Sequence, residues 1–310
     1  MGVFVFLPLV LPLTAWPVAR LAAQHLHPRT ATRLLTALAA VMATCSTVCL
    51  ALLMVVGTAQ LPGNPLPDGW SDPEVRAAVP YDEVAGRAAV PTLLVVLAAC
   101  AGTLWRHGRV RRRGHAALAG LPDTEVAVLP DDEPYAYALP GGPRGRVVVT
   151  TALLVHLEPA ERRALFAHER AHLTARHHRY LLTVRLAARA NPFLRPLRAA
   201  VAYTTERWAD EAAAEAVGSR RAVARAIGRA ALVSRGTPVP TLAGLAAPGP
   251  VPRRVAALLA PAPVTRAWPS AFTAVGLAAW TAAAGTALSA MSSANSAVTL
   301  ALVLRAATPL

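Results

Sequence analysis

Four stretches without a charged side chain limit what this chain can fold into more than any other feature. They cover residues 1–19, 34–59, 88–105 and 267–304, and each is close to or longer than the about 20 residues that cross a bilayer as a helix. Apolar residues make up 55% of the 310 residues and charged residues only 15%, a composition unusual for a soluble protein. We therefore expect about four transmembrane helices, with buried core helices as the alternative for some of the stretches.

The first and last stretches have features of their own. Pro8, Pro12 and Pro17 lie in the first, but no positive residue precedes its apolar run, which favours an uncleaved anchor over a signal peptide. The last is too long for a simple span, and polar residues interrupt it near its end: Ser292, Ser293, Asn295 and Ser296. We expect one span at about residues 268–290 and then a short interfacial tail.

The charges between the stretches predict an orientation. All 31 basic residues are arginine, and Arg20, Arg29 and Arg33 follow the first stretch. The charged residues in the loop of residues 60–87 are mostly acidic. By contrast, five arginines follow the third stretch: Arg106, Arg109, Arg111, Arg112 and Arg113. Since cytoplasmic loops carry the excess of arginine, residues 106–266 should be cytoplasmic. Their 25 arginines and 12 acids suggest a basic face against anionic lipid headgroups.

This pattern divides the chain into three parts. Residues 1–105 form an N-terminal membrane region with three helices, residues 106–266 a cytoplasmic domain, and residues 267–310 a C-terminal membrane helix with a short tail. Three runs in the middle part are rich in β-forming residues and are bounded by proline and glycine. They predict a small sheet: 126–129, 135–139 and 146–150. Because Pro159 suits a first helical turn, we expect one long helix from there to about Ala190. The fold class is then a mainly α membrane protein with a cytoplasmic α+β domain.

The run His168-Glu169-Arg170-Ala171-His172 lies within this predicted helix. Histidines four residues apart share one helix face, so both imidazoles can bind one metal ion. Glu169 lies beside the first ligand, where a carboxylate can take a proton from metal-bound water. The pattern predicts a Zn²⁺ site with Glu169 as the general base, and a solvated helix face is the alternative.

A catalytic zinc site needs a third protein ligand and an open position for water. Glu206 is the candidate, because it lies in a second helical stretch that ends at Gly218. Asp210 shares a face with Glu206, four residues away, and can accept a hydrogen bond from a ligand imidazole. Tyr203 and Arg207 flank the third ligand and are candidates for contacts to the substrate or the oxyanion.

Other metal-binding residue types in the chain are not expected to be ligands. His177 is five residues from His172 and should turn away from the ligand face of a continuous helix. We therefore expect His177 and His178 at the surface or supporting a ligand. Cys45, Cys49 and Cys100 lie in apolar stretches, away from other candidate ligands, and indicate neither a disulfide framework nor a cysteine zinc site.

These motifs resemble the membrane zinc peptidases of the BlaR/MecR type. The resemblance covers about residues 90–265, and its zinc signature is shared with the HtpX and CAAX-prenyl-protease group. It rests on the run from Tyr135 to Thr151, the motif from His168 to His172, the step Asn191-Pro192-Phe193, and Glu206 to Asp210. It implies His168, His172 and Glu206 as zinc ligands, Glu169 as base and Asp210 as support. Prenyl-protease-like relatives often have an acid at the position of His177.

The resemblance also bears on activity and substrate. It implies a zinc endopeptidase that cleaves a peptide or protein, with a cytoplasmic transcriptional repressor or a membrane protein as candidate substrate. No penicillin-binding sensor domain follows the last predicted span within the 310 residues, so β-lactam sensing is not implied. If residues 146–150 form an edge strand beside the cleft, a peptide could add to it.

Three other functions compete with this prediction. A membrane receptor or scaffold with a structural or inactive zinc site would keep the ligands, but such sites usually close the fourth position with another protein ligand. A transporter or channel would place ionisable residues within the spans, and the four stretches contain none. Nucleic acid is not expected as a direct partner, because the arginines form no recognisable base-reading module.

Overall fold

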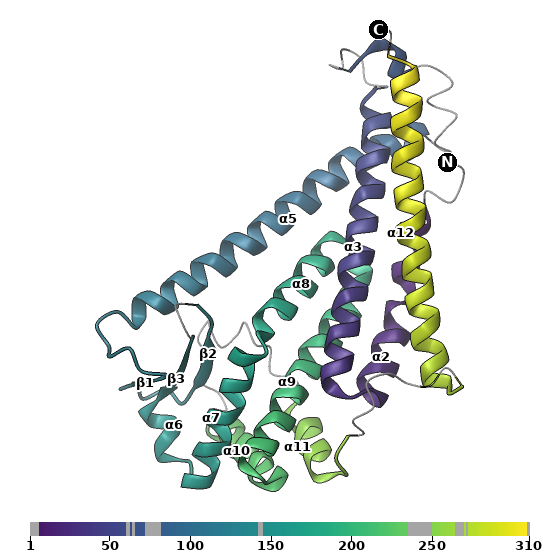
Figure 1. Cartoon of the computed structure of the whole chain (residues 1–310). Helices are drawn as coiled ribbons and strands as arrows, with labels where there is room; N and C mark the ends of the chain where they lie inside the picture. The colour runs from purple at the N-terminus through teal and green to yellow at the C-terminus, as the bar shows by residue number, and fades with distance from the viewer. Residues whose placement is uncertain are drawn as a thin grey trace.

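The structure is a computed structural model that describes residues 6–59, 63, 66–71, 82–141, 145–234, 250–263, 270 and 272–308. Most of the acidic loop predicted at residues 60–87 lies outside this described part. Of that loop, the short 3-10 helix η3 (Asp68–Ser71) is described. The Trp70 indole N–H donates to Thr308 Oγ1 over 3.0 Å, which places η3 beside the C-terminal end of the chain (Figure 1).

Three described helices are long and apolar enough to cross a membrane: α3 (Pro28–Ala59), α5 (Asp82–Ala117) and α12 (Ala274–Ala306). α3 and α12 run side by side, whereas α5 leaves the upper end of α3 obliquely and leads down to the sheet (Figure 1). Close contact at that upper end depends on two glycines, because a Cβ on Gly57 would lie 2.3 Å from the carbonyl carbon of Gly86. The structure thus confirms a mainly α membrane protein.

The first predicted span is not one continuous helix in the described residues. It forms α1 (Leu7–Val10), the 3-10 helix η2 (Leu11–Thr14) and α2 (Ala15–His25). A proline lies in the first turn of each segment. N–H groups in a first turn have no acceptor within the helix, so proline loses no helical hydrogen bond at this position, and its ring does not clash with a preceding turn. The segment packs against α3, where the Ser46 hydroxyl donates to the carbonyl oxygen of Pro8 over 2.7 Å. Within the described residues there are thus three candidate spans, compared with the four predicted.

The last predicted span is longer than expected. α12 continues through the serine-rich run to Ala306, so the interfacial tail expected after residue 290 is wrong. Ser289, Ser293 and Ser296 are buried along one side of α12. Small residues at this spacing let neighbouring helices approach closely, and the run is therefore a packing face and not a break.

A three-stranded sheet lies at the lower end of α5, as predicted (Figure 1). Its strands are β1 (Val126–Leu129), β2 (Ala136–Leu139) and β3 (Arg146–Thr150). The order is β1-β3-β2, with β1 parallel and β2 antiparallel to β3. β3 is central and pairs with a strand on each side, so the condition under which a peptide could add to residues 146–150 is not met. β2 is the edge that lies against the helix carrying the histidine motif.

The predicted helix from Pro159 to Ala190 is two helices. α7 (Pro159–Thr174) ends before Arg176, which has a left-handed backbone conformation with φ of 54°, and α8 (His177–Ala190) starts directly after it. The sequence contains neither glycine nor proline at this break, so helical periodicity alone could not place it.

Five further helices complete the fold, and most of them lie at the end of the molecule opposite the C-terminus (Figure 1). They are α6 (Thr151–Val155), the 3-10 helix η4 (Pro192–Leu194), α9 (Arg195–Val217), α10 (Arg220–Val233) and α11 (Val251–Leu259). One buried cluster joins α2 and α3 to α8 and α9 through Leu35, Met42, Val184, Leu197 and Val201. The candidate membrane helix α3 therefore shares a core with α9, the helix that carries Glu206.

Candidate active site

α7 begins at a strong helix start signal. The Glu158 carboxylate accepts from a backbone N–H of the first turn, and the Glu161 carboxylate accepts from the Glu158 N–H over 3.0 Å. Pro159 occupies the first turn, where it loses no helical hydrogen bond. This reciprocal cap fixes the register of α7 and so the direction of its two motif histidines.

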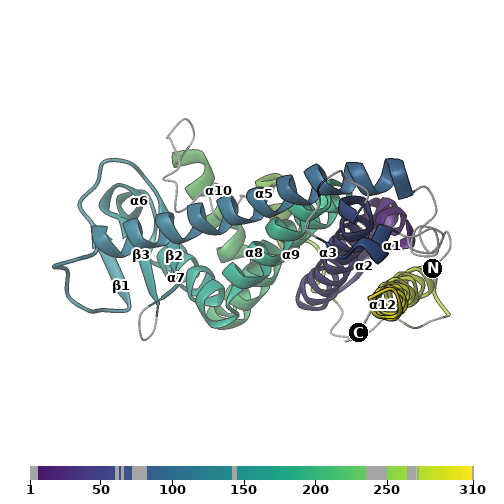
Figure 2. The same cartoon turned by 90° about the horizontal axis from the view of Figure 1, so that it is seen from above.

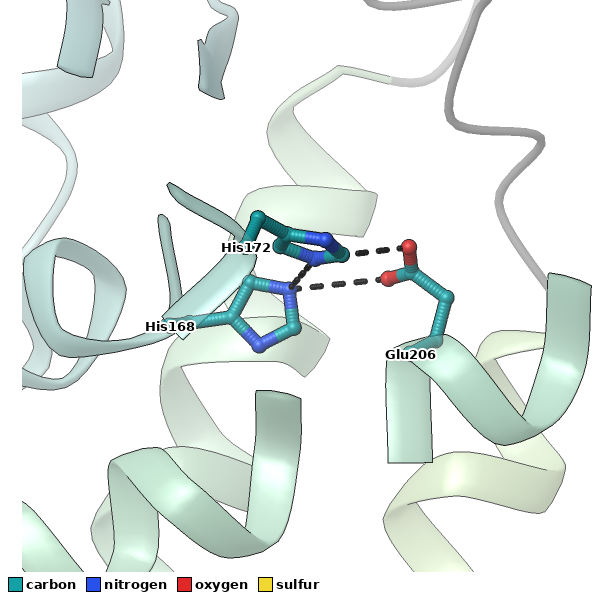
Figure 3. A group of neighbouring side chains, drawn as sticks. All are labelled: His168, His172 and Glu206. Atoms are coloured by element: carbon teal, nitrogen blue, oxygen red, sulfur yellow. Dashed lines mark hydrogen bonds and ion pairs between the residues drawn. The ribbon is translucent and has the colours of Figure 1, made fainter. Parts of the chain in front are cut away.

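His168 and His172 project from α7 towards Glu206 on α9 (Figure 3). The two Nε2 atoms are 3.1 Å apart. One Glu206 oxygen is 3.5 Å from His168 Nε2, and the other is 3.5 Å from His172 Nε2. The three side chains are 5–9% exposed. The structure thus brings the three predicted ligands together.

The spacing of these donor atoms fits a zinc ion. With Zn–N and Zn–O bonds of about 2.0–2.1 Å, neighbouring ligand atoms of a tetrahedral site are about 3.3–3.4 Å apart. The two Nε2 atoms are 3.1 Å apart and each lies 3.5 Å from one of the two Glu206 oxygens, so that one donor atom from each residue lies within 4.8 Å of the others, close to this spacing. Two imidazoles and one carboxylate are also a donor set typical of catalytic zinc. The residues present therefore fit the ion, with a fourth position for water or substrate.

Asp210 and Arg254 contact the candidate ligands and hold them in place. Asp210 Oδ1 is 3.1 Å from His168 Nδ1, the position predicted for it. The Arg254 guanidinium, from α11, contacts both carboxylates: Nη1 is 2.9 Å from Glu206 Oε2, and Nε donates to Asp210 Oδ2 over 2.9 Å. All three side chains are buried. Arg254 thus holds two buried carboxylates ionised and in fixed orientation.

Sequence reasoning did not identify Arg254. It lies 44 residues beyond Asp210, on the far side of a proline-rich segment, in a nine-residue helix. The available signal was weak: an arginine that falls on the apolar face of a short amphipathic helix, beside Leu258. Such an arginine needs a buried acid as partner, but only the fold shows which acid that is.

Neighbouring charges determine the ionisation of the ligands. Burial raises the pKa of Glu206, but His172 and Arg254 outweigh it and hold the pKa below its usual range. Burial lowers the pKa of His168, yet Asp210 and Glu206 together raise it to about 10. Burial lowers the pKa of His172 to about 4. A metal ion that binds His168 must therefore displace a proton from its imidazole.

Glu169 lies on α7 between the two histidines in sequence and faces the sheet. Burial raises the pKa of Glu169 above its usual value, although the backbone of Ala138 in β2 lies near its carboxylate and acts to lower the pKa. A raised pKa brings a carboxylate closer to the range in which it accepts and returns a proton efficiently.

A continuous helix predicted that His177 turns away from the ligands. In the structure it does not. The break at Arg176 folds it back, so that its Nδ1 lies 3.0 Å from His172 Nδ1, and its side chain is 0% exposed. Its ring packs against Trp208, with centroids 4.7 Å apart. Burial lowers the pKa of His177 to about 2, so the ring is neutral and can accept a hydrogen bond.

Tyr203 and Arg207 have other contacts. The Tyr203 ring is buried one turn before Glu206 and carries the Arg253 guanidinium 4.1 Å from its centroid. Arg207 Nη2 donates to Glu211 Oε1 over 2.6 Å, on a different side of α9 from Glu206. Their predicted contacts to substrate stay a prediction.

Part of the chain is similar to known proteases. Residues 104–189 match the family model of peptidase family M48. A protease HtpX homolog of Acidiphilium cryptum is 32% identical over 161 residues, covering 40% of this chain and 55% of the relative. A protease HtpX homolog of Moorella thermoacetica is 44% identical over 62 residues, covering 20% of this chain and 21% of the relative. The chain therefore spans about half or less of these relatives. No solved structure matches it.

The matched family segment contains His168, Glu169 and His172 but ends before Glu206. The third candidate ligand therefore rests on the geometry of the site. The matches are to M48 and HtpX-type proteases, and the more specific BlaR/MecR resemblance stays a prediction. The chain is thus similar to M48 and HtpX-type proteases over part of its length, and its described residues contain three candidate membrane helices and a His-His-Glu group that could hold a metal ion.

Proposed function

We propose that this chain is a membrane-anchored zinc endopeptidase in which His168, His172 and Glu206 bind the metal and Glu169 is the general base. The observation that carries the proposal is the group of donor atoms, with the two Nε2 atoms 3.1 Å apart and each 3.5 Å from a Glu206 oxygen, next to the half-buried Glu169 carboxylate. A structural zinc site would be expected to close its fourth position with a further protein ligand. Among the described residues, the metal-binding group consists of these three side chains.

The residues of the site divide the work of peptide hydrolysis. When bound, zinc would supply a Lewis acid that lowers the pKa of water and polarises the scissile carbonyl. Glu169 would accept the proton of the attacking water and pass it to the leaving amine, a transfer that its raised pKa favours. Asp210 orients the His168 imidazole, and Arg254 keeps Glu206 ionised.

The free edge of β2 is the proposed binding site for an extended substrate. Tyr135 exchanges hydrogen bonds with Thr150 of β3. Because hydrogen-bonding directions alternate along a strand, the backbone groups of Ala136 and Ala138 point away from β3. The Ala138 backbone lies near the Glu169 carboxylate and affects its pKa. A peptide paired with this edge would lie beside the base and would need to be unfolded there.

The proposal includes an orientation in the membrane, which we infer from the positions of the helix ends and of the arginines. The end of α3, the start of α5 and the end of α12 lie at one end of the molecule, and the site lies at the other (Figure 1). The arginines after the apolar part of α5 are on the side of the site. By the positive-inside rule, we place the site in the cytoplasm and the protein in the plasma membrane. The candidate repressor substrate rests on the sequence resemblance alone.

Zinc content and proteolysis of casein by the full chain in detergent test the proposal. Wild type and Glu169→Gln should each bind about one zinc per chain, since Glu169 is not a ligand. Glu169→Gln should lose at least 100-fold in cleavage rate, because general base catalysis contributes about 10²–10⁴-fold. Glu133→Gln, an exposed carboxylate distant in sequence, is the matched control and should cleave like wild type.

Two results would contradict the proposal. A protein without zinc that is otherwise folded would remove the metal site. Zinc bound equally by wild type and Glu169→Gln, with no cleavage of casein or of any peptide in a random library, would favour the receptor or scaffold with an inactive zinc site.

A further inference from the structure

Trp208 lies on α9, two residues beyond Glu206, and its ring contacts two other helices. α3, α8 and α9 contact one another and lie side by side in Figure 2. The half-buried ring of Trp208 packs against His177, the first residue of α8, with centroids 4.7 Å apart. The Tyr180 ring, one turn further along α8, has its centroid 6.0 Å from that of Trp208. Two arginines of α3 contact the same ring, so Trp208 joins α3 and α8 to α9.

Arg29 and Arg33 contact this ring from the start of α3. Each guanidinium carbon lies 5.6 Å from the centroid of Trp208, within the about 6 Å at which a cation is attracted to an aromatic face. Because the two arginines are four residues apart, they share one face of α3 and reach the same ring. The two cations therefore restrict the ring together.

A buried hydrogen bond fixes the position of α3 on α9 close to this contact. The Thr32 hydroxyl donates to Thr204 Oγ1 over 2.9 Å, and both side chains are at most 2% exposed. Thr32 lies between the two arginines in sequence, and Thr204 lies one helical turn before Trp208. A shift of α3 along α9 would break this bond and move the guanidinium groups away from the ring. The start of α3 is therefore held in one position on α9.

Contacts continue from Trp208 to the candidate ligand His172. His177 Nδ1 lies 3.0 Å from His172 Nδ1, and their rings meet edge to face with centroids 4.8 Å apart. His177 directly follows the left-handed residue Arg176, so no preceding turn of α8 restricts the direction of its side chain. We therefore expect packing against Trp208 to set the orientation of the His177 ring.

We propose that Trp208, with Arg29 and Arg33 of α3 on its ring, is a positioning residue for zinc binding. Trp208 holds the His177 ring so that His177 accepts the Nδ1 proton of His172, which leaves His172 Nε2 free to bind the metal. The candidate membrane helix α3 thereby supports the metal site without contributing a ligand. This inference rests on the proposed zinc site, but it needs neither proteolysis nor a known substrate.

Competition with a chromophoric chelator measures the zinc affinity of the full chain in detergent. Trp208→Leu should weaken zinc binding at least about tenfold, as for loss of a partner behind a metal ligand. Trp208→Phe keeps an aromatic ring and should retain most of the affinity. Arg29→Gln with Arg33→Gln should weaken zinc binding about two- to fivefold, because an exposed cation–π contact contributes about this factor and acts here only through Trp208.

A double variant separates positioning from a general loss of stability. If Trp208 acts through His177, Trp208→Leu should cause little further loss of zinc affinity in a protein that already carries His177→Phe. Arg20→Gln is the matched control, because the Arg20 guanidinium carbon lies 5.5 Å from the ring centroid of Trp16, a contact of the same kind on α2. It should leave zinc affinity unchanged. The melting temperature of the zinc-free protein shows whether each variant is folded.

Three results would overturn the inference while leaving the zinc site in place. These are wild-type zinc affinity in Trp208→Leu, additive losses in the double variant, and a loss in Arg20→Gln equal to that in Arg29→Gln with Arg33→Gln. If Trp208→Leu does not fold, the arginine pair variant decides by the same comparison with His177→Phe. A folded wild-type protein that binds no zinc would overturn the proposed function together with this inference.

Discussion

His177 should control zinc affinity although it is not a ligand. If His172 Nε2 binds the metal, its Nδ1 must carry a proton and donate it to His177 Nδ1, 3.0 Å away. His177→Phe keeps an aromatic ring against Trp208 but removes the acceptor. The His172 N–H would then be buried without a partner, at a cost of about 1–3 kcal/mol. Loss of a partner behind a metal ligand typically weakens metal binding about 10–100-fold, or about 1.4–2.7 kcal/mol.

The assay is competition for zinc between the purified full chain and a chromophoric chelator. His177→Asn places an amide oxygen near the position of Nδ1 and should retain zinc affinity within about threefold of wild type, since the acceptor is kept. His178→Phe makes the same change one residue later, away from the ligands, and is the control. Zinc affinity equal to wild type in His177→Phe would refute the reasoning, and so would an equal loss in His178→Phe, which would indicate a general disturbance of α8.

Four further predictions concern the site and the membrane helices. Arg254→Met should destabilise the zinc-free protein by about 3–5 kcal/mol, because two buried carboxylates lose their cation; the melting temperature in detergent measures this, and Arg253→Met is the control. A zinc chelator should lower the melting temperature of wild type, since bound metal at 100 times its Kd contributes about 2.7 kcal/mol; an unchanged value would argue against a metal in the folded protein. Ala136→Pro should raise KM for casein with little change in kcat, because proline removes an outward N–H from β2. Gly57→Ala should destabilise by about 1–3 kcal/mol through overpacking, whereas Gly102→Ala, with open space around it, should not.

Local patterns in the sequence predicted most of the secondary structure. Two of the three strands have the predicted bounds, and β2 begins one residue later. The second, third and fourth apolar stretches each form one long helix. These features depend on hydrophobicity and β-propensity within short windows, which the sequence displays directly. The predictions failed where one or two residues decide the outcome: the prolines that divide residues 7–25, the buried serines of α12 and the left-handed Arg176.

The candidate ligands were predictable because their spacing has a chemical reason. Two histidines one helical turn apart can bind one metal, and a glutamate with an aspartate four residues later can complete and support the site. The structure brings His168, His172 and Glu206 within reach of one another. Binding and catalysis by these residues are left to the experiments proposed above.

By itself, the sequence determined the apolar helices, the strands and the residue types of the metal group, because each depends on neighbours within a few positions. Tertiary structure alone decided that His177 lies against His172, that Arg254 joins Glu206 to Asp210, and that β3 is the central strand, with β2 as the edge beside α7. Each of these features either joins separate elements or depends on the backbone conformation of one residue. The physical reason is that such contacts depend on how whole helices and strands pack, and no local pattern of hydrophobicity or charge encodes that packing.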